Sequence, residues 1–115
     1  MGGSRVKKIL CLAAFMVSFS ALSAPYQIQI PTDSKATYTV LEKGSQGNLR
    51  TIVTKREGTY GTTFSQRIYN CDSNEVKYLG SGDSLDEMKN AKADPSMSPI
   101  VNQSIAYYVG REACK

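Results

Sequence analysis

Hydrophobic and polar residues alternate in steps of two along much of the chain between residues 26 and 79. The alternation is seen at 26–30 (YQIQI) and 36–41 (ATYTVL), and three further runs are rich in β-branched and aromatic residues, at 49–54 (LRTIVT), 62–71 (TTFSQRIYNC) and 75–79 (EVKYL). This alternation is typical of β-strands that bury one face. Clusters of glycine and polar residues at 43–48, 56–61 and 72–74 predict tight turns between the runs. The pattern therefore predicts an antiparallel meander of about five strands.

The hydrophobic period changes in the last third of the chain, where helices are predicted. Ser84 and Glu87 form an S-x-x-E capping box, which satisfies free amides at the start of a helix. Lys89 and Lys92 follow near the end of this segment, where the helix dipole favours positive charge. The Asp-Pro and Ser-Pro steps within 94–99 then end the helix. We therefore expect one short helix after Ser84.

A second helix is predicted after Ser104, which is a typical N-cap residue. The apolar side chains that follow recur at helical spacing. These are Ile105, Tyr108, Val109 and Ala113. A strand is the alternative, because isoleucine, tyrosine and valine also favour strands. The predicted fold class is α+β, a small antiparallel sheet of about five strands with one or two short helices packed on it and one disulfide.

Residues 1–23 have the three zones of a secretory signal peptide, in which an uncharged apolar run follows a positive segment and precedes small residues. The positive residues are Arg5, Lys7 and Lys8, and the apolar run spans 9–22. That run is too short for a transmembrane helix, which needs roughly 20 apolar residues. Cleavage is expected after Ser23, with cleavage after Ala24 as the alternative. Residues 24–115 are then a single exported domain, periplasmic or secreted.

Removing this leader changes the charge of the chain. The whole sequence has 14 basic and 10 acidic residues, and three of the basic ones leave with the leader, so the net charge falls from +4 to +1. A nearly neutral domain lacks the basic footprint that binds nucleic acid. The sequence therefore predicts no nucleic-acid partner.

The leader also contains one of the three cysteines. Cys11 could carry a lipid anchor, but Leu10 stands where a lipobox requires a small residue. We interpret Cys11 as an apolar residue of the discarded segment. Cys71 and Cys114 remain, and in an oxidising compartment they are expected to form a disulfide. Two free buried thiols are the alternative.

The residue types that carry most catalytic chemistry are missing from the sequence. There is no histidine, the usual general base near neutral pH and the commonest metal ligand. No S-x-x-K or G-x-S-x-G motif offers an activated serine. Asp83, Asp86 and Glu87 could bind calcium, but a helix cap explains the same residues without a metal ion. We therefore expect neither an enzyme nor a bound cofactor or metal.

Four basic residues fall on adjacent predicted strands or their connecting loop and form a candidate patch for an anionic partner. They are Arg50, Lys55, Arg56 and Arg67. Such a patch could bind a sulfated glycan, lipid headgroups or an acidic protein surface. The alternative is a solvated sheet face whose charges protect a strand edge.

Tyr107 and Tyr108 are a second candidate for contact with a partner. Neighbours on a helix are about 100° apart, so the two rings cannot both face the core. We expect one of them at the rim, where exposed tyrosine favours protein interfaces. The alternative is a ring that rests on the core with its hydroxyl in water.

The C-terminal half, about residues 62–115, resembles the surface-adhesin protein E family of small exported bacterial proteins. The resemblance rests on three segments, QRIYNC at 66–71, EVKYL at 75–79, and the stretch from Pro99 through Ser104 and Tyr107 to Cys114. The resemblance implies an antiparallel sheet with a packed helix. The protein after which the family is named is an adhesin for host matrix and serum proteins. The family's binding segments have no matching residues here, so the resemblance implies no site residues.

Together these observations predict a small, exported, non-catalytic binding or adhesion-type protein of the bacterial envelope. A protein or an anionic glycan is the expected partner, and no transmembrane span is expected. The alternative function is a periplasmic inhibitor or accessory factor that docks on an envelope enzyme or a secretion assembly.

Overall fold

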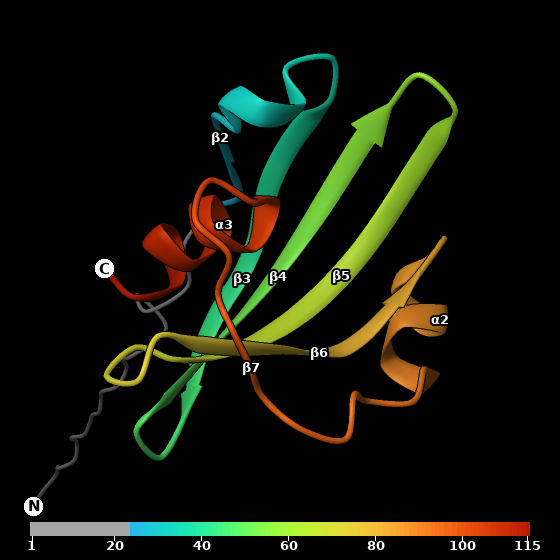
Figure 1. Cartoon of the computed structure of the whole chain (residues 1–115). Helices are drawn as coiled ribbons and strands as arrows, with labels where there is room; N and C mark the ends of the chain where they lie inside the picture. The colour runs from blue at the N-terminus through green and yellow to red at the C-terminus, as the bar shows by residue number, and fades with distance from the viewer. Residues whose placement is uncertain (1–23) are drawn as a thin grey trace, which may run out of the picture.

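The computed structural model describes residues 24–115, so the predictions for the leader, its cleavage site and Cys11 lie outside the described residues. The described chain forms one antiparallel sheet of six strands whose spatial order follows the sequence (Figure 1). The strands are β2 (Tyr26–Ile28), β3 (Thr37–Gln46), β4 (Leu49–Gly58), β5 (Gly61–Asn70), β6 (Glu75–Gly82) and β7 (Ser98–Pro99). This confirms the α+β class and corrects the strand number from about five to six. The additional strand, β7, is too short to show alternation, and its proline is tolerated because β7 lies at the edge of the sheet.

Strands β3 and β4 extend through the segments predicted as turns, which is the main correction to the predicted boundaries. Only Gly47–Asn48 and Thr59–Tyr60 remain between the paired strands. Gly47 has φ +60° while Asn48 stays at negative φ, the pattern of a II′ turn with glycine at the first central position. The polar and charged residues near these turns therefore lie on exposed strand faces instead of in loops.

A β-bulge interrupts strand β3 at Leu41. Val40 pairs with Thr54 on β4, and the next paired residue, Glu42, is opposite Val53, so Leu41 is extra. Because of the bulge, the side chains after Leu41 alternate between the two faces of the sheet one position out of step with those before it.

Helix α3 (Ile105–Ala113) covers one face of the sheet and completes the core, which confirms the predicted helix over the strand alternative. Ser104 caps it by accepting a hydrogen bond from the amide of Tyr107 at 3.1 Å. Tyr69 of β5 is fully buried at the centre, and its hydroxyl donates to the carbonyl of Ala106 at 2.7 Å. A Cβ at Gly110 would lie 2.7 Å from the Tyr69 ring, so this close approach requires glycine. The rest of the buried cluster consists of Ile30, Tyr38, Val40, Ile52, Val109 and Ala113.

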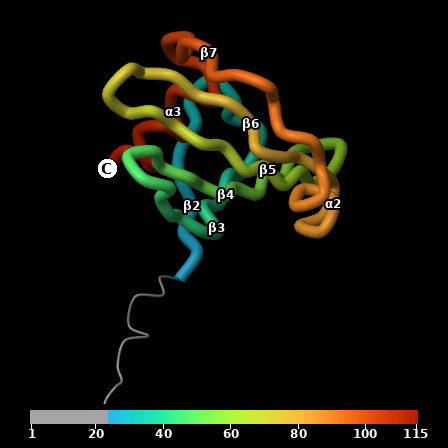
Figure 2. Tube along the Cα trace, turned by 90° about the horizontal axis from the view of Figure 1, so that it is seen from below, coloured from blue at the N-terminus to red at the C-terminus, as the bar shows by residue number. Residues whose placement is uncertain are grey.

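Helix α2 (Leu85–Asn90) lies on the opposite side of the sheet from α3 (Figure 2). The expected cap is present: the Ser84 hydroxyl accepts from the Glu87 amide at 3.1 Å, and the Glu87 carboxylate accepts from the Asp83 amide at 2.8 Å. A Cβ at Gly80 would fall 2.1 Å from the Met88 carbonyl oxygen. Glycine in β6 therefore lets α2 pack directly against the strand.

A disulfide joins Cys71 and Cys114, as the cysteine count predicted. It connects the turn after β5 to the end of α3, across 43 positions of sequence. The bond therefore fastens α3, which supplies part of the core, to the sheet that it covers.

Candidate functional site

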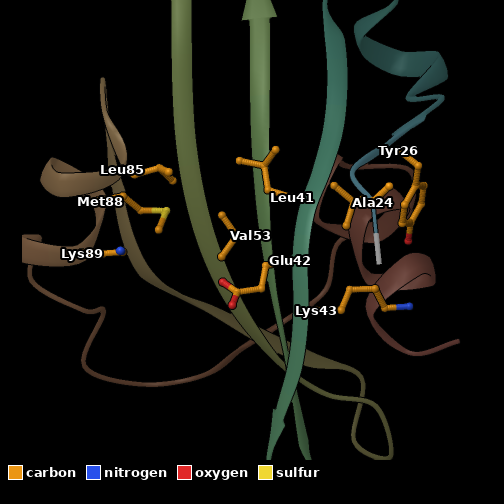
Figure 3. Close-up of a pocket in the computed structure, with 10 residues that line it drawn as sticks. Ala24, Tyr26, Leu41, Glu42, Lys43, Val53, Leu85, Met88 and Lys89 are labelled. Carbon is orange, nitrogen blue, oxygen red and sulfur yellow. The ribbon is translucent and has the colours of Figure 1, made fainter. Parts of the chain in front are cut away.

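A groove of about 510 Å³ extends from Ala24 and Tyr26, across the edge of β3, to α2 (Figure 3). Val53 of β4 lies between the two sides of the groove, and Leu41 and Glu42 line it from β3. Leu85 and Met88 line it from α2. Met88 is 3% exposed whereas Leu85 is 40% exposed, so the groove presents an accessible apolar wall. Concave apolar surfaces with a few polar groups at the rim are typical binding sites.

Local features of the sequence build both walls of this groove. The bulge places Leu41 and Glu42 together on the face of Val53, because two residues of β3 there oppose one residue of β4. On the other side, the close approach at Gly80 holds α2 against β6. The groove therefore depends on the extra residue Leu41 in β3 and on glycine at position 80 in β6.

Strand β3 has an unpaired edge next to the groove. Strand β2 pairs with β3 only from Tyr38 to Val40, whereas β3 continues to Gln46. Within residues 24–115, no strand other than β4 pairs with β3 at positions 42–46. Gln46 and Leu49 flank a two-residue turn and therefore form a hydrogen-bonded pair. By alternation, the N–H and C=O groups of Lys43 and Ser45 point away from β4, towards solvent.

Two positive side chains flank this edge on the α3 face of the sheet. Lys43 is opposite the core residue Ile52, and Ser45 is opposite Arg50, so Lys43 and Arg50 share that face. Both residues are exposed, and in the described part of the chain neither forms an ion pair. Asp72 lines a shallow depression together with Arg50, but no ion pair joins them. The edge therefore offers two cations for an external anion.

The four basic residues predicted as one anion patch are separated in the structure. Arg50 and Arg56 stand six positions apart on β4, which corresponds to about 20 Å along a strand. Lys55 lies on the opposite face of β4 and pairs with Glu57 at 3.8 Å. The fourth residue, Arg67, is only 4% exposed. These side chains do not form a common surface, because alternation and strand length place them apart.

Arg56 is engaged in a local network rather than free for a ligand. Its Nε donates to the Asp33 carboxylate at 2.8 Å, and the Tyr38 hydroxyl donates to the same oxygen at 2.7 Å. These hydrogen bonds, from Arg56 first and Tyr38 second, lower the pKa of Asp33 below its ordinary value of 3.8. Burial, followed by the hydrogen bond to Asp33, raises the pKa of Tyr38 to about 12. The network fixes the turn at Pro31–Asp33 against β3 and β4.

The lowered pKa of Asp33 predicts a pH-dependent contribution to stability. A carboxyl whose pKa is depressed in the folded state stabilises it above the ordinary pKa, and this contribution is lost as the pH falls through the folded value. Asp33→Asn is therefore expected to lower the melting temperature at pH 7, with the deficit disappearing towards pH 2. Thermal denaturation across this range measures it. Asp72→Asn is the control, because the Asp72 carboxylate forms no ion pair in residues 24–115; a deficit for Asp33→Asn that is unchanged at pH 2 would contradict the prediction.

Arg67 is buried in the sheet without a carboxylate partner in the described residues. Its Nη1 donates to the Thr54 hydroxyl at 3.2 Å and its Nη2 to the Tyr78 hydroxyl at 2.9 Å. The guanidinium carbon also lies 4.7 Å from the centre of the Tyr78 ring, a cation–π contact. Tyr78 therefore shields the charge of Arg67 from solvent, and Arg67 serves packing within the sheet.

Tyr107 and Tyr108 stack edge to face, with ring centres 5.0 Å apart. Tyr108 packs against the buried core, whereas Tyr107 lies beside Arg111, whose guanidinium carbon is 5.9 Å from the ring centre. Tyr108 therefore packs on the core and Tyr107 lies outside the core cluster. This was expected, because neighbouring residues on a helix cannot both face the core. Contact of Tyr107 with a partner stays a prediction. The fully exposed tyrosine of the described chain is instead Tyr60, in the turn between β4 and β5.

Residues 24–115 contain no cluster of three or more potential metal ligands, and none of their helices is long and apolar enough to cross a membrane.

The groove and the open edge were not predicted from the sequence. The pair Val40-Leu41 gave one weak signal, because two successive apolar residues interrupt the alternation at the position of the bulge. Comparison of the chain with models of known protein families, with curated proteins and with solved structures gives no match.

Proposed function

We propose that this chain is a small, exported, non-catalytic binding protein of the bacterial envelope, of the adhesion type. The observation that carries the proposal is the groove between β3 and α2, whose apolar wall is accessible at Leu85 and which is flanked by an unpaired strand edge. The resemblance of residues 62–115 to the surface-adhesin protein E family supports the same class. The absence of histidine from the sequence argues against an enzyme.

The groove has the composition of a protein-contact site rather than of a catalytic centre. Its lining is mostly apolar, with the ring of Tyr26 at one end, and its charged side chains are Glu42, Lys43 and Lys89. Interfaces typically combine an apolar centre with a polar rim. Leu85 lines the groove together with the buried Val53 and Met88, and because it is itself exposed it is an apolar side chain that a partner would cover.

Photo-crosslinking in an exporting Gram-negative host tests this function. A benzophenone side chain at position 89, on the rim, is expected to give a discrete adduct with a partner. Leu85→Glu in the same chain should abolish the adduct, because the buried apolar contact would then have to desolvate a carboxylate. Val101→Glu is the matched control, since Val101 is an apolar residue 71% exposed that does not line the groove, and it should leave the adduct intact.

The identity of the adduct separates adhesion from the alternative function. A host matrix protein, supplied to the cells, would support adhesion, whereas an envelope enzyme or secretion component would make the chain an inhibitor or accessory factor. An adduct that persists equally in Leu85→Glu, or no adduct at all, would contradict binding at the groove.

A further inference from the structure

We propose that the open edge of β3 receives an extended, acidic peptide segment of the partner protein, which adds a seventh strand to the sheet beside residues 42–46. This inference rests on the proposed binding function and specifies its mode. Strand addition uses unpaired backbone groups for affinity and neighbouring side chains for specificity. The edge of β3 supplies both.

The backbone requirement is met by Lys43 and Ser45. Their N–H and C=O groups point outward, in line with β2, which already pairs with the preceding stretch of β3. An incoming strand would lie in line with β2 beyond Ala24, which lines the groove together with Glu42 and Lys43, at the usual spacing of about 4.8 Å from β3. Exposed edges of this kind pair readily with another extended segment.

The side-chain requirement differs between the two faces of the sheet. On the α2 face, the added strand would lie beside Leu41 and the groove, which favours apolar side chains. On the α3 face, it would lie beside Lys43 and Ser45, with Arg50 directly behind Ser45. Because successive residues of a strand point to opposite faces, the preferred peptide alternates apolar and acidic residues.

A second copy of the chain fits this edge poorly. Two β3 edges related by a two-fold axis perpendicular to the sheet would pair antiparallel, which brings Lys43 of one copy close to Lys43, or to Ser45 and Arg50, of the other. Like charges placed opposite each other across strands are destabilising. The same positive charges attract an acidic segment, so the edge discriminates against self-association and in favour of such a partner.

Selection from a displayed library of random ten-residue peptides, against the exported chain purified from the periplasm, tests the proposal. The expected peptides alternate apolar and acidic residues and lack proline at their centre. Their binding should weaken at least ten-fold in Ser45→Pro, which removes an outward N–H without touching the β3–β4 ladder, and should be retained in Ser45→Ala. Lys43→Glu combined with Arg50→Glu should also weaken it about ten-fold, while Lys35→Glu combined with Lys92→Glu, a pair on exposed residues elsewhere, should not.

Amide hydrogen exchange adds a readout of the pairing itself. Bound peptide is expected to slow exchange at Lys43 and Ser45. Peptides with helical spacing, or binding that is equal in wild type and Ser45→Pro, would overturn strand addition. So would a library that yields no binder. If the chain with an unaltered edge still gives the Leu85-dependent crosslink in any of these cases, the binding function stands and only its mode is refuted. If that chain gives no such crosslink, the function itself is refuted.

Discussion

Replacing both Cys71 and Cys114 by serine is expected to lower the free energy of unfolding by about 4 kcal/mol. This magnitude follows from the conformational freedom that the unfolded chain regains when a loop spanning 43 positions is opened. Small domains are typically stable by about 5–15 kcal/mol in total, so the loss would remove a large part of the stability. Urea unfolding of the serine variant and of the oxidised wild type, followed by circular dichroism, measures the difference.

Reduced wild type is the control for this prediction, because it opens the same loop without changing the sequence. It should unfold at about the same urea concentration as the double-serine variant. If oxidised and reduced wild type share one midpoint, the disulfide contributes nothing measurable and the expectation is wrong.

Tyr69→Ala is expected to cost about 3–5 kcal/mol, the range for removing a large aromatic side chain from a core. Tyr69 is fully buried, and its ring fills the space left by Gly110 of α3, so truncation leaves a cavity between sheet and helix. Tyr69→Phe keeps the ring and removes only the hydrogen bond to the Ala106 carbonyl, with an expected cost of about 1 kcal/mol. Chemical denaturation of both variants checks the difference.

The comparison of the two Tyr69 variants also separates the contribution of ring packing from that of the hydrogen bond to the Ala106 carbonyl. If Tyr69→Phe were as destabilising as Tyr69→Ala, the hydrogen bond to the helix would dominate and the packing argument would fail. A small loss for both variants would show that α3 rearranges to fill the cavity.

The parts of the fold that were predictable are those encoded by local pattern. Strand-forming residues in 62–71 and 75–79, with a tight turn at 72–74 between them, predicted β5 and β6. Ser84 and Ser104 marked both helix starts through their capping chemistry. The disulfide followed from counting cysteines after residues 1–23 were set aside as a predicted leader. In each case the physical cause acts within a few residues or leaves a single pairing possible.

The candidate site was not predictable, because neighbours distant in sequence decide it. Arg67 looked like a surface cation, but its burial depends on Tyr78 and Thr54 from the adjacent strands. Likewise, the groove requires that Leu41 and α2 meet on one face, which depends on the register of β3 against β4 and on Gly80. The unpaired edge follows from the shortness of β2, and no pattern within β3 reveals how long its neighbour is.

The strict sequence order of the six strands has a consequence for how the chain acquires its structure. Each strand pairs with the strand that comes before it, so the sheet can grow by adding one hairpin at a time without waiting for distant segments. Folding is fast where contacts are local, because little loop entropy is lost before each contact forms. A chain that crosses a membrane from its N-terminal end could therefore begin to assemble β2 to β5 while later segments are still in transit. Helix α3 would then pack onto a sheet that has already formed, and the disulfide would hold it in place.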